Sequence, residues 1–258
     1  MRHATQSAMA RWCVAGWWFL SLLAAAGADE PPLPAARGRE LQAAWERTIR
    51  EASAVLEQNP HDLTAYSRRG DAYFFSGQFA AAIADYDRMV ELDPSLDAAH
   101  WRRGIACFYA GRYADAAAQF ERYHTFDNVD RENGIWRYLS QVKAQGKEQA
   151  RAGLLKYAKD DREPFPAVYE MFAGRMSAEQ ILEQIARADI SPAEREKRRF
   201  YADLYIGLHE WVEERPESAQ RHLARAVRNS WGPQGGYGPH YMWHVARLHE
   251  ASLREGKK

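Results

Sequence analysis

The chain has 258 residues, which is enough for one medium-sized domain or one short array of repeats. Its 35 Lys and Arg residues balance 35 Asp and Glu residues, so no overall field attracts nucleic acid or anionic lipid, and nucleic-acid binding is not expected. Hydrophobic residues make up 46% of the chain, a composition that suits packed helices and argues against disorder.

Residues 1–28 have the pattern of an export signal. Arg2 and Arg11 give a positive start, residues 12–26 form an uncharged apolar run, and residues 26–28 read Ala-Gly-Ala, a small-x-small cleavage site. The apolar run has about 15 residues, fewer than the ~20 that a membrane-spanning helix needs. The pattern predicts a cleaved secretory signal peptide, with an uncleaved anchor helix as the alternative. The rest of the chain is expected to be exported in either case.

A Pro- and Gly-containing linker and a helix are expected next. Residues 29–38 contain three prolines and Gly38, a composition that predicts a linker without helix. Residues 39–59 place Leu41, Trp45 and Ile49 on one helical face, so a leading helix should pack ahead of whatever follows.

The next two segments are similar to each other at a spacing of 34 residues. The matching pairs are Pro60 and Pro94, Arg69 and Arg103, Gly70 and Gly104, Gly77 and Gly111, and Tyr86 and Phe120. This period and these residue types resemble the tetratricopeptide repeat (TPR), a helical hairpin of 34 residues. We therefore expect one repeat at residues 63–96 and a second at residues 97–130, in which a glycine on the first helix lets the two helices approach closely.

The remaining chain predicts further helices. Residues 131–159 look like a degenerate hairpin broken near Gly146, and residues 160–190 form an insert with short helices. Two helix starts are expected to be capping boxes, Ser177-x-x-Gln180 and Ser191-Pro192-x-Glu194. Residues 191–256 should form a last TPR-like unit and a terminal helix over residues 240–250. The expected fold is all-α, a right-handed solenoid of helical hairpins with an insert before the last repeat.

The order of these elements is similar to that of the NlpI-type periplasmic TPR lipoproteins. The most distinctive stretch is residues 169–182, YEMFAGRMSAEQIL, followed by Tyr205-Ile206-Gly207 and Ser218-Ala219 in the last repeat. The resemblance implies a periplasmic or cell-envelope adaptor that acts as a homodimer, with peptidoglycan hydrolases or a processing protease as partners. That family is lipidated on a cysteine at the cleavage site, where this chain has Ala28-Asp29, so no lipid anchor is expected.

No residue pattern predicts catalysis. His240 and His244 share a helix face, as in a two-histidine zinc site, but Tyr241 replaces the catalytic glutamate and a third ligand is not evident. The acidic run at Asp160, Asp161 and Glu163 is expected to be a solvated turn. Cys107 falls at an apolar helix position and should be a buried, inert thiol. We therefore expect neither an enzyme nor a bound cofactor.

The concave surface of the repeats is the expected binding site. Side chains on the first helix of each hairpin line this surface in a TPR array, and arginine flanked by aromatic residues is typical of protein interfaces. The expected groove residues are Ser67, Arg68, Asp71, Phe74 and Phe75 in the first repeat, and Trp101, Arg102, Ile105, Phe108 and Tyr109 in the second.

The function expected from the sequence is that of an exported adaptor that binds other proteins at the cell envelope. A small-molecule or metal-binding module that uses His240 and His244 is the first alternative, and a structural protein of envelope assembly is the second.

Overall fold

The computed structural model describes residues 31–159 and 161–256, and within these two ranges all regular structure is helical. The α-helices are α1 (Ala35–Gln58), α2 (Leu63–Phe75), α3 (Phe79–Leu92), α4 (Trp101–Tyr109), α5 (Tyr113–Phe126), α6 (Arg131–Gln145), α7 (Lys147–Ala152), α8 (Phe165–Phe172), α9 (Ala178–Arg187), α10 (Pro192–Val212), α11 (Pro216–Arg228) and α12 (Tyr237–Arg254). Two short 3-10 helices, η1 (Pro94–Leu96) and η2 (Gly232–Gln234), complete them. The all-α prediction is confirmed, whereas the predicted signal segment, residues 1–28, lies outside the described residues.

Three glycines mark the closest helix contacts in the hairpins. A Cβ atom on Gly70 would lie 2.6 Å from the ring of Tyr86 in α3, and one on Gly104 would lie 2.7 Å from the ring of Phe120 in α5. Gly207 in α10 meets Leu223 in α11 at the same 2.7 Å. Because no side chain fits at these positions, glycine allows the two helices of each pair to approach closely. The pairs are α2–α3, α4–α5 and α10–α11.

The start of α1 and one of the two expected capping boxes differ from the predictions. Helix α1 begins at Ala35, inside the segment predicted as linker, because the three prolines end at Pro34 and that residue occupies the position before the helix. Ser177 and Gln180 form the expected capping box in both directions. Ser191 caps α10, but the side chain of Glu194 pairs with Arg198 instead of returning to Ser191, so only half of the second box forms.

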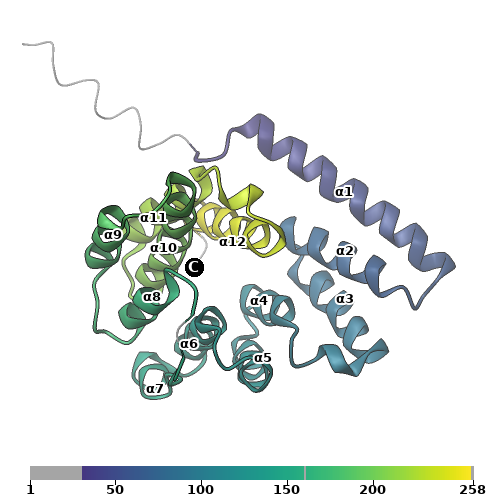
Figure 1. The fold of residues 1–258 in the computed structure, drawn as a ribbon. Helices are drawn as coiled ribbons and strands as arrows, with labels where there is room; N and C mark the ends of the chain where they lie inside the picture. The colour runs from purple at the N-terminus through teal and green to yellow at the C-terminus, as the bar shows by residue number, and fades with distance from the viewer. Residues whose placement is uncertain (1–30, 160, 257–258) are drawn as a thin grey trace, which may run out of the picture. The chain divides into compact units, whose positions relative to one another are not determined.

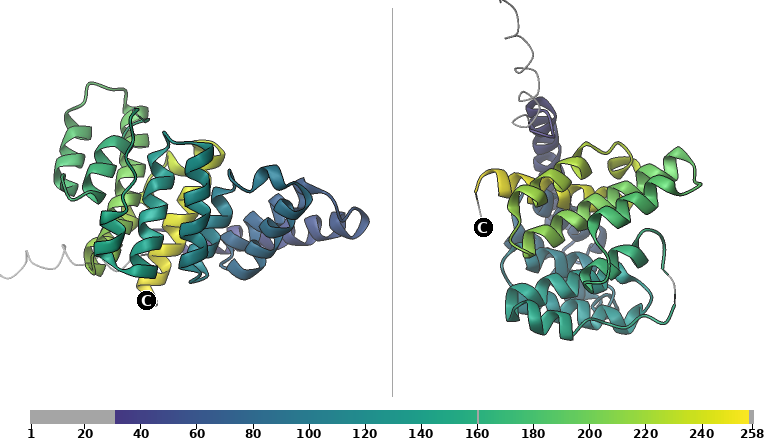
Figure 2. Two further views of the ribbon diagram at one scale, coloured as in Figure 1. Left: turned by 90° about the horizontal axis from the view of Figure 1, so that it is seen from below. Right: turned by 90° about the vertical axis from the view of Figure 1, so that its left-hand side faces the viewer.

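Helix α12 lies on the inner side of the curve that the hairpins form, as Figure 1 shows for residues 32–256. The views of Figure 2 show the same placement. It packs against α11, which precedes it, and also against α2 and α4 from the first two repeats. It is also longer than the expected terminal helix over residues 240–250. Across the described ranges, none of the helices combines the length and the apolar character that crossing a membrane requires.

Candidate functional site

Most of the expected groove residues contact α12 of the same chain. The rings of Phe74 and Tyr241 stack with their centroids 4.9 Å apart, and Phe75 lies 4.0 Å from the ring of His244. Trp101 meets Tyr241 edge-on at 4.9 Å. Phe74 and Tyr241 are fully buried. Helix α12 therefore covers the aromatic part of the concave surface in the first two repeats.

A polar network joins the same helices. Asp71 is 9% exposed and accepts hydrogen bonds from the hydroxyls of Tyr86 (2.7 Å) and Tyr237 (2.6 Å). Nη1 of Arg102 donates to the same carboxylate at 2.7 Å and to the hydroxyl of Ser67 at 2.9 Å. Two of the expected ligand contacts, Asp71 and Arg102, thus hold each other and the start of α12 in place.

The remaining predicted groove residues have different surroundings. Tyr109 and His249 are joined by a hydrogen bond of 3.1 Å between the hydroxyl and Nδ1. Phe108 packs edge-on to Trp136 in α6, and Ile105 is fully buried. Arg68 is exposed and forms a 3.7 Å ion pair with Glu51 of α1. Whether any of these ten residues contacts a ligand stays a prediction.

The histidines of α12 lie in an apolar setting. His244 is fully buried against Trp45 and Phe75, and burial lowers its pKa well below the usual value. Burial also lowers the pKa of His249 to about 3, so both rings are neutral near pH 7. Within residues 31–159 and 161–256, no group of three or more His, Cys, Asp or Glu side chains is arranged to hold a metal ion. Cys107 is free and buried, as predicted.

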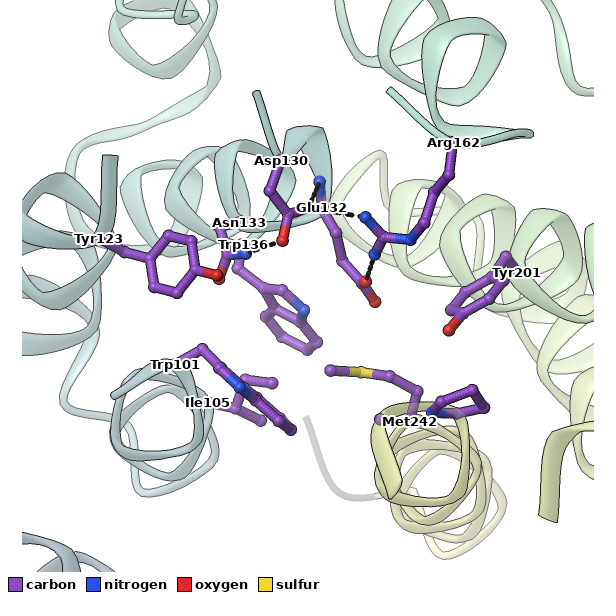
Figure 3. Close-up of a pocket in the computed structure, with 12 residues that line it drawn as sticks. Trp101, Ile105, Tyr123, Asp130, Glu132, Asn133, Trp136, Arg162, Tyr201 and Met242 are labelled. Atoms are coloured by element: carbon purple, nitrogen blue, oxygen red, sulfur yellow. Dashed lines mark hydrogen bonds and ion pairs between the residues drawn. The ribbon is translucent and has the colours of Figure 1, made fainter. Parts of the chain in front are cut away.

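An open recess remains on the concave side, next to the start of α12. Its volume is about 260 Å³, and it lies between α4, α5, α6, α10 and α12 (Figure 3). Its lining residues, which define the recess, are Trp101, Ile105, Tyr123, Asp130, Glu132, Asn133, Trp136, Arg162, Tyr201, Gly238, Pro239 and Met242. Small-molecule sites usually have about 300–1,000 Å³, so this recess suits a group of side-chain size.

Acidic side chains dominate the polar wall of the recess. Arg162 pairs with Asp130 at 3.3 Å and also with Glu132 (Figure 3). The hydroxyl of Tyr205 donates to Glu132 and accepts a 3.1 Å hydrogen bond from Nε1 of Trp136. Burial raises the pKa of Glu132 to about 7, against the opposite effect of Arg162. The wall can accept hydrogen bonds from a donor or a cation.

The prediction of a solvated acidic turn is wrong for Asp161, while Glu163 is exposed and Asp160 lies outside the described residues. Its side chain is 6% exposed, pairs with Arg162 at 3.2 Å and accepts a 2.9 Å hydrogen bond from the backbone N–H of Arg131. The turn folds back onto the start of α6, which needs an acceptor for its free N–H groups. Sequence reasoning also missed Asp130, Glu132 and Arg162. The acidic residues at the start of α6 were a detectable signal for the first two, whereas Arg162 follows a turn of irregular sequence.

The comparisons with known proteins agree with the geometry of the hairpins. The sequence model of the tetratricopeptide repeat family matches residues 42–97 and again residues 67–130. A comparison with curated proteins found no match. TPR hairpins generally mediate protein–protein interaction and act as non-enzymatic scaffolds. Residues 42–130 therefore carry tetratricopeptide repeats, and the chain folds as an all-α helical solenoid.

Proposed function

We propose that the protein is an adaptor that binds partner proteins by a basic side chain inserted into the recess. The observation that carries the proposal is the recess, which has acidic and aromatic walls. Helix α12 covers the concave surface of α2 and α4, and the recess beside it stays open. The concave side is the usual binding surface of a TPR array.

The chemistry of the walls favours a cation. Asp130 and Glu132 line the recess, and Arg162, which pairs with both, is the one cation among the lining residues. Asp161, outside the lining, pairs with the same guanidinium, so three carboxyl groups share one cation. Trp101, Trp136 and Tyr201 provide aromatic surface, and a cation over an aromatic face gains ~0.5–2 kcal/mol, with the larger value in desolvated sites. Lysine and arginine of a partner meet both requirements.

Selection of peptides from a displayed library on the purified chain tests this proposal. We expect the selected peptides to share a lysine or arginine, and Asp130→Asn to weaken their binding about tenfold, since a charge-assisted contact contributes ~1.5–3 kcal/mol. Asparagine still caps a helix, so α6 keeps its start.

Two controls make the result specific. Glu148→Gln removes an exposed carboxylate of α7 outside the recess and should leave binding unchanged. Peptides in which the basic residue is replaced by glutamine should bind wild type and Asp130→Asn equally weakly. Selected peptides without basic residues, or equal binding by wild type and Asp130→Asn, would refute the proposal.

We further propose that the adaptor is exported and works at the cell envelope, with peptidoglycan-remodelling enzymes or a protease among its partners. The signal-like pattern of residues 1–28 and the resemblance to NlpI-type proteins support this assignment. Cell fractionation and amino-terminal sequencing of the recovered chain provide the test. Recovery from the cytoplasm with residues 1–28 intact would contradict it.

A further inference from the structure

A second cavity, on the other side of the first turn of α6, has the opposite electrostatic character. Its volume is about 400 Å³, within the range of small-molecule sites. The residues that line it, and that define it as the basic cavity, are Arg131, Arg151, Ala152, Leu154, Leu155, Lys156, Tyr157, Tyr169, Glu170, Ala173 and Arg175. Four of these are cations and one is an acid.

Arg131 is the buried cation of this cavity. The residue is only 9% exposed, and its guanidinium lies over the ring of Tyr157 at 5.0 Å. Its Nη1 is buried and has no hydrogen-bond partner in the described part of the chain. A buried guanidinium donor without an acceptor is costly, because its N–H groups give up hydrogen bonds to water and form none in the protein. An acceptor atom bound in the cavity would remove that cost.

The rim of the basic cavity carries three cations, of which Arg151 pairs with Glu213, outside the lining, at 3.5 Å. Arg151, Lys156 and Arg175 are exposed, and Glu170 is the only acid among the lining residues. Glu170 is engaged by Arg175 through a bidentate pair, in which Nη2 and Oε1 are 2.8 Å apart. The lining therefore carries an excess of three positive charges, more than one carboxylate of a ligand would balance. Leu154, Leu155 and Ala173 offer apolar surface beside these charges.

We infer that the basic cavity binds the phosphate group of a small organic ligand, with Arg131 at its base and Arg151, Lys156 and Arg175 at its rim. Phosphate carries the charge and the acceptor oxygens that several cations can share, and arginine pairs with it bidentately. The organic part of the ligand lies on the two leucines and Ala173. This site is separate from the recess, and its occupation does not depend on the proposed adaptor function.

Calorimetric titration of the full chain with inorganic phosphate and with glycerol 3-phosphate, at constant ionic strength, tests the inference. We expect saturable binding of both, with tighter binding of the ester, and no binding of acetate. Lys156→Gln should weaken phosphate binding about tenfold, since a charge-assisted hydrogen bond contributes enough for one decade in affinity. Lys159→Gln, which removes an exposed lysine outside the lining, should leave the affinity within about twofold of wild type on the same scale.

A variant with increased affinity provides a sharper test. Glu170→Gln removes the competing carboxylate and frees Arg175, so phosphate binding should become several-fold tighter. Arg131→Met should abolish saturable binding while circular dichroism shows that the chain is folded. If Arg131→Met fails to fold, Lys156→Gln and Glu170→Gln decide, because both lie at the rim.

Vesicles that contain phosphatidylglycerol distinguish the two sources of a phosphate group. Binding to these vesicles that is lost in Lys156→Gln and kept in Lys159→Gln would place the phosphate on a lipid headgroup. Binding of glycerol 3-phosphate with the same variant pattern would place it on a soluble ester. Absence of saturable binding in both arms, or binding that Lys156→Gln and Glu170→Gln leave unchanged, would overturn the inference.

Discussion

Replacing Glu132 by Gln should make the protein more stable at alkaline pH and leave it unchanged at acidic pH. Glu132 is 8% exposed, and its carboxyl group accepts hydrogen bonds from Tyr205 and Arg162. Burial raises its pKa from 4.5 in the free side chain to about 7 in the folded chain. Glutamine has nearly the same shape and can accept the same hydrogen bond from Tyr205.

The pKa difference fixes the sign and the size of the effect. Between pH 4.5 and 7 the folded state holds a proton on Glu132 that the unfolded state has lost. The contribution of Glu132 to stability is therefore complete below pH 4.5 and is lost as the pH rises through 7. A pKa rise from 4.5 to about 7 corresponds to about 3 kcal/mol in the free energy of unfolding. The variant keeps this free energy at pH 8 because glutamine does not ionise.

Urea unfolding of wild type and Glu132→Gln at pH 5 and pH 8 measures the difference directly. We expect the variant's advantage in the free energy of unfolding to be below about 1 kcal/mol at pH 5 and to approach 3 kcal/mol at pH 8. Glu148→Gln, on the exposed side of α7, should show no such change between the two pH values. The reasoning is refuted if Glu132→Gln and wild type differ by the same amount at both pH values, or if the variant is the less stable at pH 8.

Four further results are expected. Gly104→Ala should lower the free energy of unfolding by ~1–3 kcal/mol in urea titration, because the new Cβ would lie 2.7 Å from the ring of Phe120; an unchanged midpoint would show that the helices can separate freely. Tyr241→Ala should cost ~3–5 kcal/mol in the same assay, since this fully buried ring packs on α2 and α4, and a loss below ~1 kcal/mol would mean that α12 is weakly docked. His249 is neutral in the fold, with a pKa of about 3, so its contribution to the free energy of unfolding is present above pH 6.5 and is lost as the pH falls toward 3. His249→Gln should therefore reduce the loss of thermal stability between pH 7 and pH 5. Cys107 should react with a thiol reagent only after denaturant is added, and rapid labelling of Cys107 itself in the native chain, located by peptide mapping apart from Cys13, would contradict its burial.

The repeated part of the fold was predictable because each hairpin follows local rules. Gly70 and Gly104 are separated by the repeat length, and both do in the structure what a close helix contact requires. The capping box at Ser177 and the left-handed glycine after α6, Gly146 with φ of 96°, likewise depend only on neighbouring residues.

The position of α12 could not be predicted in this way. Its aromatic residues show that one face is buried, but nothing in their spacing identifies α2 and α4 as the surface that covers them. The same holds for the recess and the basic cavity. Asp130 and Arg131 are adjacent in sequence, yet one lines the acidic recess and the other the basic cavity. Only the direction that each side chain takes at the start of α6 separates the two charges.

The contact between α2 and α12 has a consequence for the way the chain unfolds. In an open array each repeat touches only its neighbours, so terminal repeats can fray independently. Here the hydroxyl of Tyr237 and the carboxylate of Asp71 join residues 166 positions apart. That closure raises the contact order of the fold and couples its first repeat to its last helix, so the solenoid should unfold cooperatively, as a closed chain. Amide hydrogens of α2 and α12 are then expected to exchange in the same opening event, after those at the free end of α1.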